Sequence, residues 1–133
     1  MQRAVRGAPP ARALARYARA AARAGMTVTL RVVGAAEARR LNRAFRRRDY
    51  APNVLAFDYG EGAGDIVLCH PVIRREARAQ RKRLAAHYAH LVVHGMLHLR
   101  GYDHARRADA ARMRRAEARV LRRLGFADPY ALE

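Results

Sequence analysis

Several residue types are missing or nearly missing from this 133-residue chain, and each absence excludes something. There is no serine, which excludes every mechanism based on a serine nucleophile. Cys69 is the only cysteine, so no disulfide can form within the chain, and a reducing, cytoplasmic compartment fits. No apolar run approaches the roughly 20 residues that a helix needs to cross a bilayer, so we expect no membrane segment.

Acidic residues are also scarce. The chain has 11 acidic and 28 basic residues, which gives a formal net charge of +17. Every basic residue except Lys82 is arginine, which contacts phosphate in a planar, bidentate way, so a polyanionic partner is one interpretation. The other is composition, since a GC-rich genome enriches alanine, arginine and glycine together. We assign most of the total charge to composition, which leaves individual arginines in special positions to be explained.

Periodicity and turn residues predict one α+β domain over residues 1–133. We expect helices over residues 10–24, 35–45, 71–80, 84–99 and 108–124, and strands over residues 26–33, 54–57 and 65–69. The segment 84–99 is apolar on more than one side, which predicts a helix buried in the core. The last helix places four apolar residues on one face, namely Met113, Ala116, Val120 and Leu124.

Three histidines have the spacing of a metal site. His94 and His98 are four residues apart on the predicted core helix and therefore project from the same face. Gly101 can end that helix and let the chain turn, so that His104 returns to the same point. Three imidazoles with one open position for water are typical of catalytic zinc, so we predict one Zn²⁺ here. Nickel, cobalt and copper suit the same ligands, and affinity alone does not select zinc.

Two further histidines, His87 and His90, share this helix face. They lie about 10 and 6 Å along the helix axis from His94, at 1.5 Å per residue, which is too far for direct ligation. Packing is the favoured interpretation for both, and support of the ligands or contact with substrate are the alternatives.

Gly95 separates this pattern from that of the zinc peptidases. Their motif H-E-x-x-H-x-x-G-x-x-H matches the chain at the three histidines and at Gly101, but glycine stands where the peptidase has its general-base glutamate. Without that carboxylate, attack of water on a peptide bond lacks its base. The sequence therefore predicts a metal site without peptidase activity.

The same segment, residues 94–104 (HGMLHLRGYDH), resembles the H-G-x-L-H-L-x-G-Y-D-H signature of the YbeY family of bacterial endoribonucleases. Other blocks resemble the family in the same order along the chain, namely LNRAFRRRD (41–49), NVLAF (53–57), GDI (64–66), PVIRREA (71–77) and GFADPY (125–130). The resemblance covers about residues 26–131. It departs from the family at Pro52 and Ala56, where threonine and serine are usual, so local hydrogen bonding there is expected to differ.

This resemblance implies a small mixed sheet packed with helices, one of which carries the histidines. It implies His94, His98 and His104 as zinc ligands and Arg46 as the functional arginine facing the metal cleft. It implies cleavage of single-stranded ribosomal RNA in small-subunit maturation, including the 3′ end, and ribosome quality control. The expected partners are ribosomal RNA and the small subunit. The family also opens with a strand, of which residues 1–5 are at best a remnant, through a misassigned start codon or a genuine loss.

The sequence does not identify the group that takes the proton. Asp103 and Asp65 are the candidates, although a carboxylate beside a ligating histidine more often orients the imidazole, and Asp65 could equally hold a loop. Two other functions stay open. One is a metal-dependent hydrolase of a peptide or small molecule, and the other is a non-catalytic ribosome-assembly factor in which zinc only stabilises the fold.

Overall fold

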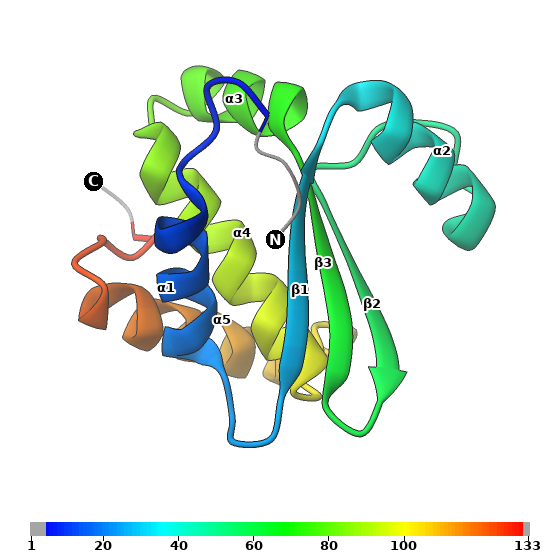
Figure 1. Ribbon diagram of the computed structural model, residues 1–133. Coiled ribbons are helices and arrows are strands. Elements are labelled where there is room, and N and C mark those ends of the chain that lie inside the picture. The colour runs from blue at the N-terminus through cyan, green and yellow to red at the C-terminus, as the bar shows by residue number, and fades with distance from the viewer. Residues whose placement is uncertain (1–4, 132–133) are drawn as a thin grey trace.

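A three-stranded mixed sheet lies beside a layer of helices in the computed structural model, which describes residues 5–131 (Figure 1). The strands are β1 (Thr27–Val33), β2 (Val54–Gly60) and β3 (Ala63–Cys69), in the order β1-β3-β2. β1 runs parallel to β3, and β2 runs antiparallel to it. The α+β class predicted from the sequence is confirmed, and residues 1–4 of the expected strand remnant lie outside the described residues.

The helices follow the predicted segments closely. They are α1 (Ala11–Ala21), α2 (Ala35–Arg46), α3 (His70–Ala79), α4 (Leu84–Leu99) and α5 (Arg107–Arg123). α4 has the predicted bounds, and α1 is shorter than predicted because the chain turns to extended backbone at Ala22. Within residues 5–131, no helix has the length and apolar character that crossing a membrane requires.

The β2–β3 hairpin differs from the prediction, which placed a loop over residues 60–64. Only Glu61 and Gly62 connect the two strands, and both have positive φ, 55° and 81°. Positive φ at both central residues is the geometry of a two-residue hairpin turn that matches the twist of its strands. The glycines that suggested a loop are therefore part of the strand ends and the turn, and β2 reaches further along the sheet than predicted.

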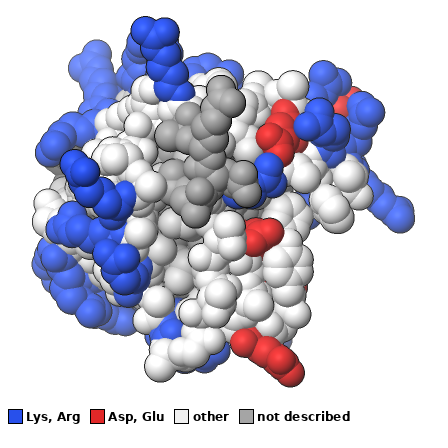
Figure 2. All heavy atoms as spheres, in the orientation of Figure 1, with Lys and Arg blue, Asp and Glu red and all other residues white. Residues whose placement is uncertain are grey.

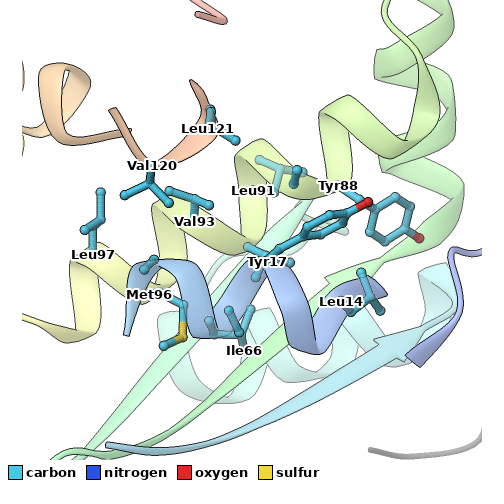
Figure 3. Packing of buried hydrophobic residues seen from close by; sticks show 14 of the residues in the cluster. Leu14, Tyr17, Ile66, Tyr88, Leu91, Val93, Met96, Leu97, Val120 and Leu121 are labelled. Carbon is cyan, nitrogen blue, oxygen red and sulfur yellow. The ribbon is translucent and has the colours of Figure 1, made fainter. Parts of the chain in front are cut away.

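α4 is the central element of the core. It packs against α1, α3, α5 and the sheet, and Figure 3 shows side chains from these layers meeting around it. The labelled residues include Leu14 and Tyr17 from α1, Ile66 from β3 and Val120 from α5. The predicted burial of α4 on several sides is thus confirmed, and the predicted apolar face of α5 is buried as well. This packing fixes the helix that carries His94 and His98.

Candidate metal centre

The structure brings the three predicted ligands and Arg46 to one pocket. His94 and His98 of α4, His104 of the following loop and Arg46 at the end of α2 line a pocket of about 190 Å³. Residues 54–56 of the edge strand β2 form its other wall. The ring centroids of His94 and His104 are 5.9 Å apart, and those of His98 and His104 are 6.4 Å apart. Residues far apart in the sequence therefore line one pocket.

The end of α4 explains how His104 returns to this pocket. Gly101 has a φ of 100°, and the Tyr102 amide donates to the carbonyl of Leu97, which closes the helix as a glycine C-cap does. The Asp103 carboxylate then accepts hydrogen bonds from the backbone amides of His104, at 2.6 Å, and Ala105, at 3.2 Å. These bonds also lower the pKa of Asp103. Asp103 thus shapes the loop that presents His104.

The chemistry of these side chains fits a metal ion. Two imidazoles on one zinc would have ring centroids about 5 Å apart, given a Zn–N distance of about 2.1 Å. The observed centroid separations are slightly larger, and no three His, Cys, Asp or Glu side chains within residues 5–131 are close enough to hold an ion in the conformation described. His98 and His104 are exposed, so ring rotation can close this gap.

The ionisation of His98 also suits ligation. The pKa of His98 is lowered mainly because its ring is partly removed from water. Repulsion by the nearby His94, His104 and Arg46 side chains lowers this pKa further. A lowered pKa keeps the imidazole neutral at pH 7, and the neutral ring is the form that binds metal. The His98 imidazole is therefore in the form that ligation needs.

Glu117 of α5 is the main residue of the site that sequence reasoning missed. Its fully buried carboxylate accepts a hydrogen bond of 2.5 Å from Nδ1 of His94, and further bonds from His90, at 3.0 Å, and from the Tyr130 hydroxyl, at 2.6 Å. Burial alone would raise the pKa of Glu117, but these hydrogen bonds outweigh it and lower the pKa to about 2. A charged carboxylate at Nδ1 fixes the proton there and leaves Nε2 of His94 as a lone-pair donor.

A signal for Glu117 is present in the sequence. Glu117 lies on the buried face of α5, four residues after Met113 and three residues before Val120. A carboxylate on an apolar helix face needs a buried partner, because an unpaired buried charge is costly. The histidines of α4 are the partners, but periodicity does not reveal which helix lies opposite.

The other predicted residues take different places. Asp65 accepts a hydrogen bond of 2.8 Å from the Tyr59 hydroxyl and lines a separate pocket with Phe45 and Phe57. His87 is buried against Glu76, with 2.9 Å between Nε2 and Oε1, which is the packing role favoured from the sequence. His90, by contrast, contacts Glu117 and so supports His94 indirectly.

A hydrogen bond to the backbone of β2 distinguishes Arg46 from its neighbours Arg47 and Arg48. Nη2 of Arg46 donates a hydrogen bond of 2.8 Å to the carbonyl of Ala56 on β2. β2 is an edge strand, so it presents backbone carbonyls that such a side chain can reach. Arg47 has a φ of 58°, which turns the chain away directly after Arg46 and ends α2. Arg46 is therefore the arginine of this run that lines the histidine pocket.

The structure gives a steric reason for glycine at position 95. α4 approaches the sheet so closely that a Cβ at this position would lie 3.0 Å from Cδ1 of Ile66. Ile66 is fully buried in the core and has little room to move. The place that a zinc peptidase gives to its glutamate is thus occupied here by the helix–sheet contact.

Comparisons with known proteins find several that are similar to this chain. A family model described as endoribonuclease YbeY matches residues 11–125. Among curated relatives, the endoribonuclease YbeY of Bordetella pertussis is 59% identical over 112 residues, which is 80% of this chain and 71% of the relative. That of Thiobacillus denitrificans is 52% identical over 127 residues, covering 91% of this chain and 86% of the relative. The solution structure of TM1509 from Thermotoga maritima has a TM-score of 0.55 at 23% identity, covering 91% of this chain and 88% of that one.

Proposed function

The chain belongs to the YbeY family of endoribonucleases, and from this premise we propose that it is a zinc-dependent enzyme that cleaves single-stranded ribosomal RNA. Its proposed role is small-subunit maturation, including 3′-end processing, and ribosome quality control, with the small subunit as partner. The observation that carries this proposal is the pocket in which Arg46 and the three histidines meet. A cation beside a set of metal donors suits a phosphodiester, whose charge grows as it is cleaved.

Each residue has a definite task in this proposal. His94, His98 and His104 would hold the zinc ion, which when bound supplies Lewis acidity towards a phosphate oxygen or an attacking water. Arg46 keeps one donor on Ala56 and directs its remaining donors to the phosphate, where they neutralise the developing charge. Asp65 lies in another pocket, and the Asp103 carboxylate accepts the amides of His104 and Ala105, so neither is assigned as the group that takes the proton.

Charge reversal at Arg46 tests the proposed catalytic role. Arg46→Glu should lower the cleavage rate of precursor ribosomal RNA at least about 100-fold, the scale of one preorganised transition-state donor, without changing zinc content. The matched control is Arg47→Glu, which makes the same charge change one residue away and should keep most of the activity. Rates are measured on zinc-loaded protein, and zinc content by elemental analysis. Equal rates for Arg46→Glu and wild type would remove Arg46 from the mechanism.

Chelation separates cleavage from a purely structural role of zinc. Removing the metal should stop cleavage while RNA binding, measured by fluorescence anisotropy, and the circular dichroism spectrum remain. A zinc-loaded protein that binds precursor RNA without cutting it would instead favour the non-catalytic assembly factor. Hydrolysis of casein or of an ester without hydrolysis of RNA would favour a metal-dependent hydrolase of a peptide or small molecule.

Glu117→Gln should weaken zinc binding about 10- to 100-fold, the usual effect of losing a carboxylate behind a ligating histidine. The glutamine side chain is nearly isosteric, but it is neutral, and it has a single acceptor oxygen where the carboxylate has two that accept from His94, His90 and Tyr130. The charge-assisted hydrogen bond at His94 Nδ1 is therefore lost, and with it the stabilisation of the tautomer that leaves Nε2 free for the metal. Affinity is measured by competition with a chelating dye.

The control for Glu117→Gln is Asp103→Asn, which also removes one negative charge near the histidines. The oxygen of asparagine can still accept the backbone amides of His104 and Ala105, so zinc affinity should change less than threefold, or about 0.6 kcal/mol. An equal loss in both variants would show that net charge, and not the His94 hydrogen bond, sets the affinity.

A further inference from the structure

A groove of about 460 Å³ runs along α5, outside the pocket of the three histidines. Its walls carry four exposed arginines, Arg114, Arg115, Arg119 and Arg122. Ala111 and Ala118 on the same helix supply short side chains, which leave the space between the guanidinium groups open. Arg115, Arg119 and Arg122 follow each other at four and three residues, so they line one face over about 11 Å of helix.

The charge of this groove is largely uncompensated. Within residues 5–131, none of these four arginines forms an ion pair with an acidic side chain. Asp128 also lines the groove, but its carboxylate accepts the Tyr130 amide at 2.9 Å. Figure 2 shows basic side chains crowding the side of the molecule where α1 and α5 lie. Composition accounts for the number of arginines, whereas their alignment along one groove makes a concave surface for anions.

A third hollow lies between the groove and the histidine pocket. This third pocket, of about 310 Å³, is lined by His94 and His104 on one side and by Arg114 and Tyr130 on the other. It therefore shares the two histidines with the metal pocket and shares Arg114 and Tyr130 with the arginine groove. The three hollows are therefore neighbours on the surface, in an order that leads from the three histidines to α5.

Tyr130 lies at the junction with a fixed orientation. Its hydroxyl donates to the buried Glu117 carboxylate, while 43% of the residue is exposed. The guanidinium of Arg114 lies 5.8 Å from the centroid of its ring. An anchored, exposed aromatic ring beside an arginine is a stacking surface for a nucleobase, and such surfaces alternate with basic groups in proteins that hold single strands.

We propose that the groove of Arg114, Arg115, Arg119 and Arg122 binds the sugar-phosphate backbone of the single-stranded RNA that flanks the cleaved bond. This inference rests on the proposed function, because it takes the RNA strand to pass through the histidine pocket. The strand then continues over Tyr130, where a base stacks, and its following phosphates are held by the arginines. The groove thus extends the substrate site beyond the nucleotides at the metal and gives the enzyme a preference for longer single strands.

The test compares two double variants of equal charge change. Arg115→Glu with Arg119→Glu alters the groove, and Arg74→Glu with Arg78→Glu places the same change, at the same spacing, on the exposed face of α3. Binding of zinc-loaded protein to 2′-O-methyl oligoribonucleotides of about 4 and about 12 nucleotides is measured by fluorescence anisotropy at several salt concentrations. Cleavage of the unmodified oligoribonucleotides is measured separately.

The groove variant should bind the longer strand about tenfold more weakly. The slope of its log affinity against log salt concentration should also fall in magnitude by about 1.4, because each of two lost phosphate contacts contributes about 0.7. Its affinity for the short strand should stay within twofold of wild type. Equal weakening by the α3 variant, or equal weakening for both lengths, would overturn the groove proposal. Absence of cleavage in wild type would overturn the proposed function instead, and the binding result would still decide the groove.

Discussion

Zinc should be lost, and RNA cleavage with it, when His98 is replaced with alanine. Only His94 and His104 would then remain as imidazole donors, whereas catalytic zinc sites use three protein ligands. His98 is in the exposed class, so the substitution should leave the metal-free fold within about 0.5 kcal/mol of wild type. Zinc content after dialysis, cleavage rate and the urea unfolding curve of the metal-free protein measure the three expectations.

His90→Gln is the control for this variant, because it also removes an imidazole from the same face of α4. His90 contacts the Glu117 carboxylate, and a glutamine amide can still donate to it, so zinc should be retained. If His98→Ala kept one zinc per chain, the ligand set proposed from the spacing of the histidines would be wrong. If it lost zinc only through unfolding, the metal-free unfolding curves would differ.

The sequence predicted this site to the extent that local spacing defines it. Two histidines four residues apart on a helix, followed by a helix-ending glycine, are a local pattern, and the structure brings His94, His98 and His104 to one pocket. Arg46 was found in another way. It stands among Arg46, Arg47 and Arg48, which composition cannot tell apart, and only resemblance to a family selected it. Its bond to Ala56 now supplies the physical distinction.

What the sequence could not predict depends on pairing between distant elements. Glu117 lies 23 residues after His94, on a helix whose position across α4 is set by the packing of the core. Asp103 and Asp65 are carboxylates near the motifs, yet the buried carboxylate that accepts from His94 comes from α5. The β2–β3 hairpin was missed for a related reason, since Gly60, Gly62 and Gly64 are turn signals locally but form part of a continuous hairpin.

Introducing the peptidase glutamate should destabilise the protein and should not create a peptidase. Gly95 is buried at the contact between α4 and β3, where an added Cβ would meet Cδ1 of Ile66 at 3.0 Å. Overpacking of this kind costs about 1–3 kcal/mol, and burying a carboxylate without a partner adds several more. Gly95→Glu should therefore remove about 4 kcal/mol or more of the unfolding free energy, a large part of the usual 5–15 kcal/mol. Urea unfolding measures this loss.

Gly95→Ala separates the steric effect from the effect of charge. Alanine gains about 1 kcal/mol of helix propensity over glycine, so a net loss of stability in this variant would have to come from the contact with Ile66. Ile66→Val removes the Cδ1 atom that the new Cβ would meet. In the double variant the two changes should compensate, with a coupling energy of about 1 kcal/mol.

These variants of Gly95 and Ile66 together distinguish two reasons for glycine at position 95. If close approach of α4 to the sheet requires it, Ile66→Val relieves the alanine variant but not the glutamate variant, whose carboxylate stays buried. If the pocket needs glycine only to admit substrate, both Gly95 variants should keep wild-type stability and lose cleavage alone, because Gly95 also lines the histidine pocket. The structure favours the first reason, since Ile66 is fully enclosed and an added side chain at position 95 would point at it. The packing that sets α4 on the sheet therefore also excludes the peptidase base from the proposed metal centre.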